Sequence, residues 1–226
     1  MTGQSTAAFV AAWDGPLHVV VNNAGVMVAP ETRTADGWEL QFATNHVGHF
    51  ALASSLYDAL ASAAGARVVA VSSLAHLRSP VVFEDIHFRE RRYDPWLAYG
   101  QSKTANILFA VEATKRWAAD GITVNALHPG GIRTNLQRHV SDEELNRLRT
   151  EAYRGPAVWK TPEQGAATSV LLAASPLVDG VSGRYFEDCA EAEPYRDGAL
   201  RGVADYALDP AAADRLWQET LEMLAA

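Results

Sequence analysis

The sequence is poor in cysteine: Cys189 is the only one among 226 residues, so no disulfide forms within the chain. A single thiol fits a reducing compartment, and we expect it to be a small, buried or half-buried side chain. No apolar run approaches the ~20 residues that a membrane-spanning helix needs. The first residues, Met1 to Gln4, lack the basic start of a signal peptide. These absences favour a cytoplasmic protein with no membrane span.

Positive charge is also scarce. The chain has 19 Lys and Arg against 27 Asp and Glu, a net charge of −8, which argues against nucleic acid or an anionic membrane as the main partner. The seven histidines show no metal-ligand spacing, because His46 and His49 lie three residues apart without a cysteine or third histidine to support them. We therefore expect neither a nucleic-acid interface nor a metal centre.

Apolar, β-branched runs alternate with helical patterns along the chain. Strands are expected at residues 17–21, 67–71, 121–127 and 183–186, and helices at 5–13, 37–64, 95–117, 141–153, 161–174 and 210–225. This order predicts one α/β domain with a parallel sheet and right-handed crossovers. Ligands bind such sheets beyond the carboxyl ends of the strands, where Asn22, Ser73 and Pro129 are expected to lie.

The segment 37–64, with Asp36 as its expected N-cap, is apolar on two sides. One stripe includes Leu40 and Val47 and the other includes Phe42, and both follow the spacing of a helix. One stripe can pack on the sheet, and the other needs a neighbouring helix or a second subunit. We therefore expect a homo-oligomer through helices 37–64 and 96–117.

Tyr99 and Lys103 lie four residues apart on a predicted helix and share one face. A phenol titrates at ~10, and a nearby ammonium lowers that pKa, so Tyr99 is a candidate general acid or base. Ser73, at the end of a strand, can donate a hydrogen bond to a substrate oxygen. An exposed Tyr–Lys contact and a turn serine are the ordinary alternatives for these residues.

Other polar and flexible positions also follow the strands. Asn22-Asn23-Ala24-Gly25 and Pro129-Gly130 can be simple turns, with Gly25 supplying backbone freedom. Asn45 interrupts an apolar stripe, and a buried amide tied to backbone at a helix bend is the alternative to a functional role. His76 and His128 lie near the strand ends, either lining a cleft or as satisfied, structural histidines.

Taken together and in this order, these residues resemble the motifs of the short-chain dehydrogenase/reductases, NAD(P)-dependent oxidoreductases. The matching stretches are Asn22-Asn-Ala-Gly25, Asn45, Ser73, Tyr99-x-x-x-Lys103 and Pro129-Gly130. Asn45-His-Val-Gly-His-Phe50 and Ser102-Lys-Thr-Ala-Asn106 look closest to the retinol dehydrogenase-like branch. The resemblance covers essentially the whole chain and implies a Rossmann-type parallel sheet flanked by helices.

The resemblance implies a role for each matching position. Tyr99 would exchange a proton with the substrate oxygen, Lys103 would lower the pKa of Tyr99 and hold the nicotinamide ribose, and Ser73 would orient the carbonyl. Asn45 would hold a water in a proton relay. The cofactor, NAD or NADP, would be bound by Asn23, Ala24, Gly25, Tyr99, Lys103, Pro129, Gly130, Ile132 and Thr134.

The chain departs from the family at its beginning. The family starts with a strand and a Thr-Gly-x-x-x-Gly-x-Gly turn that brings pyrophosphate to a helix N-terminus. Thr2-Gly3 imitates that turn, but Ala7 and Phe9 occupy the glycine positions. We therefore expect residues 1–226 to form an incomplete, N-terminally truncated domain that lacks the first strands and the residue selecting NAD or NADP. Residues 17–22 would then be an exposed apolar edge, and cofactor binding would be weak.

The activity that the resemblance implies is hydride transfer between a nicotinamide cofactor and the carbonyl or alcohol of a small-molecule substrate. Residues 136–160 are expected to form a lid, whose Tyr153 and Trp159 favour a lipophilic substrate. Two alternatives stay open. One is a catalytically inactive relative acting as an interaction protein. The other is a nucleotide-sugar epimerase, which would want a larger substrate domain than residues 136–226 provide.

Overall fold

The apolar runs of the sequence form parallel strands in the computed structural model, which describes residues 8–153 and 159–225. The sheet has five strands in the order β1-β2-β3-β4-β5. They are β1 (Val19–Asn22), β2 (Arg67–Val71), β3 (Thr123–His128), β4 (Tyr185–Glu187) and β5 (Ala190–Glu191). The first four are parallel and β5 is antiparallel to β4. The predicted α/β class with its parallel sheet is confirmed.

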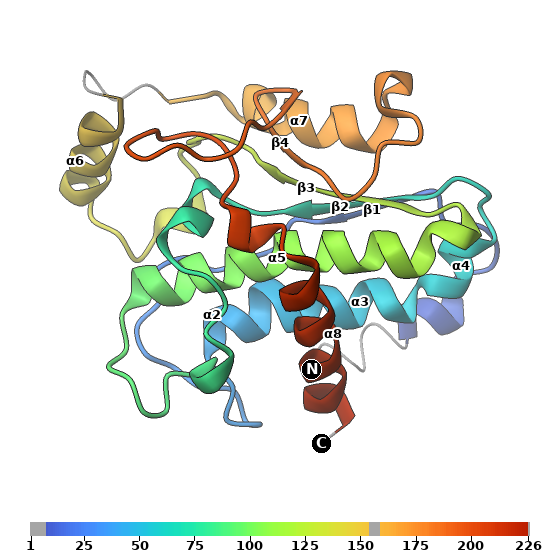
Figure 1. Ribbon diagram of the computed structural model, residues 1–226, viewed down its shortest axis with the longest axis horizontal. Coiled ribbons are helices and arrows are strands. Elements are labelled where there is room, and N and C mark those ends of the chain that lie inside the picture. Colours follow the sequence, from blue (N-terminus) through green and yellow to red (C-terminus); the bar gives the residue numbers. More distant parts are fainter. Residues whose placement is uncertain (1–7, 154–158, 226) are drawn as a thin grey trace.

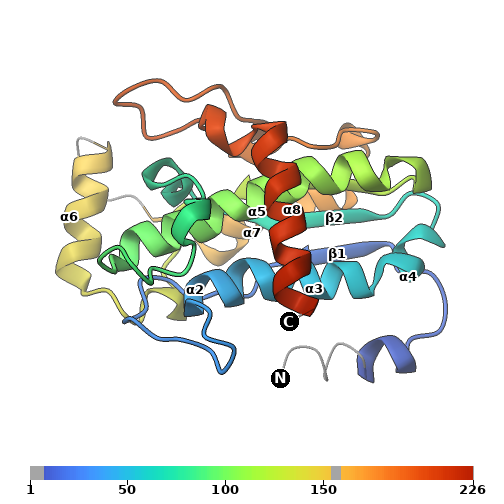
Figure 2. The same ribbon diagram turned by 60° about the horizontal axis from the view of Figure 1, so that its bottom comes forward.

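Helices cover both faces of this sheet (Figure 1). On one face lies α7 (Pro162–Ala174), and on the other lie α3 (Gly48–Ser55), α4 (Tyr57–Ala61) and α5 (Pro95–Trp117). α6 (Asp142–Tyr153) stands apart at one end of the molecule, and α8 (Pro210–Ala225) crosses over α5 and α3 (Figure 2). Residues 8–12 are helical too, whereas residues 5–7 of the predicted helix 5–13 lie outside the described part.

Side-chain caps set the starts of the two long sheet-covering helices. The Asp94 carboxylate accepts hydrogen bonds from the N–H groups of Trp96 and Leu97, and Pro95 occupies the first helical position of α5. Thr161 and Gln164 form a capping box at the start of α7, again with a proline at the first position. These local signals explain why both helices begin where the sequence predicts.

The single helix predicted over residues 37–64 is wrong, because the segment is divided into shorter pieces. α2 (Leu40–Phe42) is capped by the Glu39 carboxylate rather than by Asp36. Ala43–Val47 form a π-helical turn, and Leu56, with φ −94° and ψ 2°, separates α3 from α4. An apolar residue every three or four positions fits these wider turns as well as a regular helix, so the periodicity does not reveal the breaks.

The antiparallel β5 also escapes sequence prediction. Asp188 and Cys189 form its turn from β4, and their φ angles of 49° and 61° lie in the left-handed region. Asn-Gly is the usual signature of such a turn, and Asp-Cys gives no comparable signal. Cys189 is exposed in this turn, so the expectation of a buried or half-buried thiol is wrong.

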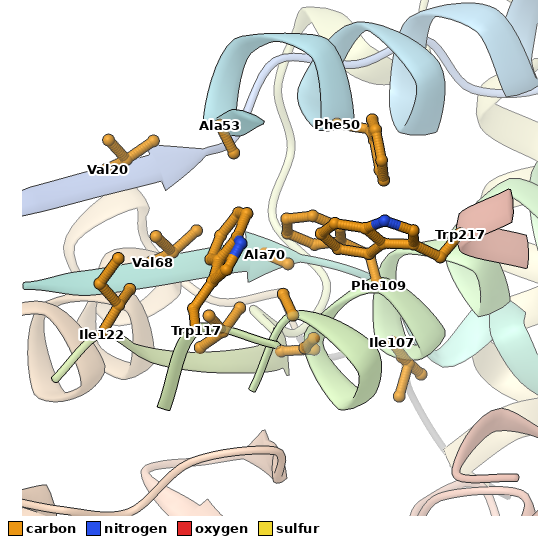
Figure 3. Close-up of a cluster of buried hydrophobic side chains, with 14 of the residues drawn as sticks. Val20, Phe50, Ala53, Val68, Ala70, Ile107, Phe109, Trp117, Ile122 and Trp217 are labelled. Carbon is orange, nitrogen blue, oxygen red and sulfur yellow. The ribbon is translucent and has the colours of Figure 1, made fainter. Parts of the chain in front are cut away.

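The main hydrophobic core lies between the sheet, α3 and α5, and α8 closes it (Figure 3). Phe109 of α5 stacks on Trp217 of α8 with ring centroids 6.0 Å apart and planes 1° apart. Phe50 of α3 meets Trp217 edge-on at 4.6 Å. Phe42, in the second apolar stripe, packs in a separate cluster with Ala213 and Leu216 of α8. α8 therefore covers part of that stripe within one chain. Part of the apolar surface that motivated the predicted homo-oligomer through helices 37–64 and 96–117 is thus buried within one chain. The homo-oligomer itself stays a prediction.

Among the described residues, β1 has a hydrogen-bonded neighbour on one side only, namely β2. Its Val19 and Val21 side chains are 37% and 41% exposed. This is the apolar edge expected for residues 17–22, and such edges tend to pair with another strand. The glycine-poor segment at Thr2 and Ala7 lies outside the described residues.

Candidate active site

A cleft of about 790 Å³ opens beyond the carboxyl ends of β1, β2 and β3, with walls from α5, α6 and α7. Most of the site residues predicted from the sequence line it. They are Asn23, Gly25, Ser73, Tyr99, Lys103, Pro129, Gly130, Ile132 and Thr134. Ala24 and Asn45 do not line the cleft. The strand-end motifs, far apart in sequence, are thus brought to one cleft by the parallel sheet.

Tyr99 and Lys103 are placed by the first two turns of α5 and are almost fully buried, at 3% and 4% exposure. The Lys103 ammonium lies 5.6 Å from the centroid of the Tyr99 ring. Its Nζ donates a hydrogen bond of 3.0 Å to the carbonyl of Val71, at the end of β2. The lysine is therefore tied to the strand end while its remaining N–H groups stay available to the cleft.

Burial dominates the titration of this pair. It raises the pKa of Tyr99 to about 12, and a hydrogen bond with Ser73 offsets only part of that rise. Burial also lowers the pKa of Lys103 to about 8. The expected lowering of the Tyr99 pKa by Lys103 is thus not seen here, because the ammonium sits over the ring and bonds to Val71. Tyr99 is a neutral phenol at physiological pH.

Ser73 follows β2 and caps the short 3-10 helix Leu74–Arg78. Its hydroxyl oxygen accepts a hydrogen bond of 3.1 Å from the N–H of Ala75, which fixes the side chain at the cleft wall. Ser73 lines the same cleft as Tyr99, and its side chain partly offsets the rise in the pKa of that phenol. Ser73 is therefore both a turn serine and a polar group beside the phenol, so the ordinary and the functional readings of this residue are compatible.

Asn45 lies behind the cleft, fully buried in the π-helical turn. Its Oδ1 accepts from the N–H of Val26 at 2.9 Å, and its Nδ2 donates to the Val26 carbonyl at 2.9 Å and to Ser102 Oγ at 2.9 Å. A Cβ added to Gly25 would lie 3.0 Å from Asn45 Oδ1 and 3.8 Å from Lys103 Nζ. Asn45 thus shapes the loop after β1, which approaches the lysine closely.

The Pro129-Gly130 segment contacts the side chain of Lys160, a residue that the sequence motifs did not indicate. Gly130 has φ +93°, and a Cβ there would lie 2.7 Å from Lys160 Cδ. Lys160 Nζ donates to the Pro129 carbonyl at 3.3 Å and pairs with Asp188 in the β4–β5 turn. The left-handed backbone angle at position 130 favours glycine there.

The lid predicted over residues 136–160 contains α6 and contributes apolar walls. Leu145 packs in a cluster with Met27, Val28 and Tyr99, and Trp159 lies against the same cluster. Residues 154–158 and the side chain of Tyr153 lie outside the described part. Sequence patterns missed further lining residues from other segments. They are Met27, Leu77, Arg78, Trp96, Leu148 and Leu200. Trp96 alone carried a signal, since it precedes Tyr99 by three residues on one helix face.

His76 is a structural histidine. It is fully buried and does not line the cleft. Its Nε2 accepts from the N–H of Ala204 at 3.2 Å, so its Nδ1 carries the proton and donates to the Ser73 carbonyl at 2.8 Å. His128 does line the cleft, and its Nδ1 accepts from the N–H of Leu74 at 3.2 Å. In residues 8–153 and 159–225 no cluster of three His, Cys, Asp or Glu side chains could hold a metal ion.

Comparison with known proteins identifies the family. The short chain dehydrogenase model matches residues 2–145. A protein named "Probable oxidoreductase" from Streptomyces lividans is 57% identical over 229 aligned positions, which cover 98% of this chain and 77% of that protein. Retinol dehydrogenase 14 from Mus musculus is 44% identical over 201 positions, covering 89% of this chain and 57% of that protein. The chain therefore belongs to the short-chain dehydrogenase family of NAD(P)-dependent oxidoreductases, with retinol dehydrogenase-like relatives, as its motifs predicted.

Solved structures agree on the fold. The structure of an uncharacterized protein from Mycobacterium Paratuberculosis has a TM-score of 0.71 and 32% identity, covering 99% of this chain and 72% of that chain. The 3-alpha-hydroxysteroid dehydrogenase from Pseudomonas sp. B-0831, complexed with NADH, has a TM-score of 0.63 at 24% identity, covering 82% and 76% of the two chains. Among the described residues, no helix is long and apolar enough to cross a membrane.

Proposed function

We propose that the cleft catalyses reversible hydride transfer between a nicotinamide cofactor and a carbonyl or alcohol on a lipophilic small molecule. The observation that carries this proposal is the meeting of Ser73, Tyr99 and Lys103 in the lining of one cleft, with the Lys103 ammonium 5.6 Å from the centroid of the Tyr99 ring. A proton donor, an orienting hydroxyl and a cation within reach of one another are what carbonyl reduction requires.

The described residues fit the nicotinamide and ribose end of such a cofactor. Lys103 Nζ keeps N–H groups that Val71 does not use, and it lines the cleft beside Tyr99. Gly25 and Gly130 line the cleft with backbone atoms and have no side chains of their own. Asn23, Pro129, Ile132 and Thr134 would complete this part of the site. When bound there, the nicotinamide supplies or accepts the hydride.

The proton comes from the chain itself. Because the pKa of Tyr99 is raised to about 12, the resting phenol is a proton donor, and a carbonyl oxygen beside it would receive that proton. Ser73 would donate a hydrogen bond to the same oxygen and fix its direction. Lys103 is charged below a pKa of about 8 and places a positive charge in the lining of the same cleft. This resting state favours carbonyl reduction over alcohol oxidation.

The lining of the cleft supports a lipophilic substrate. Met27, Leu145 and Trp159 join the side chains around Tyr99 in one apolar cluster, and Leu136 packs against it. Burying apolar substrate surface there contributes about 25 cal/mol for each Å² removed from water.

The test compares Tyr99→Phe with Tyr57→Phe, which removes a hydroxyl that bonds to Asp120 away from the cleft. With medium-chain aldehydes and NADH or NADPH, the Tyr99 variant should lose ~10²-fold or more in kcat, since general acid catalysis contributes that much. Energy transfer from tryptophan to the reduced nicotinamide should report unchanged binding. Full activity in Tyr99→Phe would overturn the proposal. A wild-type chain that binds cofactor yet reduces no carbonyl would favour an inactive relative.

A further inference from the structure

Arg78 gives the cleft an unexpected charge. Among the described residues that line the cleft, the only Lys or Arg side chains are Lys103 and Arg78, and none is Asp or Glu. The chain as a whole has 27 acidic and 19 basic residues. A cleft without carboxylates in so acidic a protein attracts an anion rather than a cation.

Arg78 is held in a defined place at the cleft. It ends the 3-10 helix Leu74–Arg78 that Ser73 caps. Its guanidinium carbon lies 4.8 Å from the centroid of the Trp96 ring, a cation–π contact. A Cβ at Gly100 would lie 3.1 Å from Arg78 Cβ and 2.7 Å from the Ala75 carbonyl oxygen. Only a glycine at position 100 therefore allows α5 to lie this close to the 3-10 helix Leu74–Arg78.

The guanidinium has no anionic partner in the described part of the chain. It forms no ion pair or hydrogen bond with residues 8–153 or 159–225, although it carries five N–H donors. Two carboxylates of α6 have partners other than Arg78. Glu144 accepts from Trp96 Nε1 at 2.9 Å, and Asp142 pairs with Arg133 at 2.6 Å. A planar fork of donors stacked on an aromatic ring suits a carboxylate, which it can bind through two parallel hydrogen bonds.

The position of Arg78 relative to the reacting group is set by α5. Trp96 precedes Tyr99 by three residues, so the two residues share one helix face, with their Cα atoms about 4.5 Å apart along the axis. Tyr99 belongs to the apolar cluster that contains Met27 and Leu145, and Trp96 packs against this cluster. A ligand with its carbonyl at Tyr99 and an apolar body along this cluster would end near Arg78.

We propose that Arg78 binds the carboxylate of an amphipathic substrate, an oxo acid or hydroxy acid with an aliphatic body. This inference rests on the proposed hydride transfer for the oxygen at Tyr99, but the anion site itself does not depend on turnover. Arg78 would therefore be a specificity-determining residue that separates acids from neutral lipophilic alcohols and aldehydes.

The first experiment measures binding without cofactor. Isothermal titration calorimetry of the chain with octanoate and with octan-1-ol compares an acid and an alcohol of equal length. Octanoate should bind more tightly, and Arg78→Leu should weaken it about tenfold or more, as expected for a charge-assisted hydrogen bond. Octan-1-ol should bind both proteins alike. Arg78→Lys should retain part of the preference, and Arg92→Leu, an exposed arginine outside the cleft, should change nothing.

Equal binding of octanoate and octan-1-ol to the wild type, or unchanged octanoate binding in Arg78→Leu, would overturn the inference. Turnover separates it from the proposed function. If the chain reduces methyl esters of ω-oxo acids but shows no preference for the free acids, only the Arg78 inference fails. If octanoate binding depends on Arg78 but no carbonyl is reduced, only the hydride-transfer proposal fails. Raising the salt concentration should weaken octanoate binding and leave octan-1-ol unaffected.

Discussion

Asn45 and Ser102 join two parts of the site that are 57 residues apart, through a hydrogen bond of 2.9 Å from Asn45 Nδ2 to Ser102 Oγ. Ser102 in turn donates to the carbonyl of Tyr99 at 2.8 Å. The Asn45 side-chain amide also accepts a hydrogen bond from the N–H of Val26 and donates one to the Val26 carbonyl. One buried side chain thus fixes the loop after β1 against the helix that carries Tyr99 and Lys103.

Replacing Asn45 by Ala would leave the Val26 N–H, the Val26 carbonyl and Ser102 without this partner. Each buried polar group left unsatisfied costs ~1–3 kcal/mol, so we expect a loss of at least ~2 kcal/mol in the free energy of unfolding. Urea unfolding followed by circular dichroism measures it. Asn135→Ala, at an exposed asparagine just before the lid, is the control and should stay within ~0.5 kcal/mol of wild type. If Asn45→Ala lowers the free energy of unfolding by no more than the control does, the hydrogen bonds of Asn45 do not stabilise the fold as described.

The sheet and most helices could be predicted because their signals are local or periodic. Val68 to Val71 read as a buried strand, and Pro95 and Thr161 mark helix starts. The π-helical turn at Asn45 could not be predicted, because it is stabilised by Val26, a contact between segments 19 residues apart.

The catalytic part of the site could likewise be predicted from ordered motifs, whereas the walls of the cleft could not. Arg78 and Leu200 come from segments without a motif, and the fold alone brings them to the cleft. Lys160 does not line the cleft but bonds to the carbonyl of Pro129, which does. The direction of the pKa shift of Tyr99 also could not be predicted from the sequence. Lys103 was expected to lower the pKa of Tyr99, but the depth of burial decides the direction and raises it instead.

The pH dependence of carbonyl reduction should report Lys103. Its pKa is lowered to about 8 by burial, so the ammonium is present below that pH and lost as the pH rises through it. We expect kcat/KM to fall above pH ~8, because this parameter follows the ionisation of the free enzyme. Lys103→Arg keeps the charge to a much higher pH and should shift this limb upward, even if its absolute activity is lower. An unshifted limb in the arginine variant would assign the ionisation to another group.

Buried histidines should make the chain sensitive to mild acid. Burial lowers the pKa of His46 to about 3 and those of His49 and His76 to about 4. Between these values and the unfolded pKa of ~6.5, the unfolded chain binds protons that the folded chain does not, so stability falls as the pH falls. Each histidine adds up to ~1.4 kcal/mol per pH unit to this slope.

Urea unfolding at several pH values between 7.5 and 5 tests this dependence. His46→Gln should reduce the slope by about one proton, since it removes a ring whose Nε2 bonds to Thr220 in the core. His139→Gln, at an exposed position, should leave the slope unchanged. Equal slopes in wild type and His46→Gln would show that His46 is not the group that resists protonation.

The open edge of β1 should control association of the chain. Val19 and Val21 expose apolar side chains on a strand that, among the described residues, pairs on one side only, and lysine on an edge strand opposes pairing with another strand. Val19→Lys is preferable to a change at Val21, because Val21 lines the cleft. We expect Val19→Lys to lower the rate of aggregation at 37 °C, measured by light scattering, with little change in secondary structure. Val170→Lys is the matched control. Val170 is 61% exposed on α7, so a lysine there adds the same charge away from the edge strand. If both variants suppress aggregation equally, net charge is the cause, and if neither does, β1 is not the surface through which the chains associate.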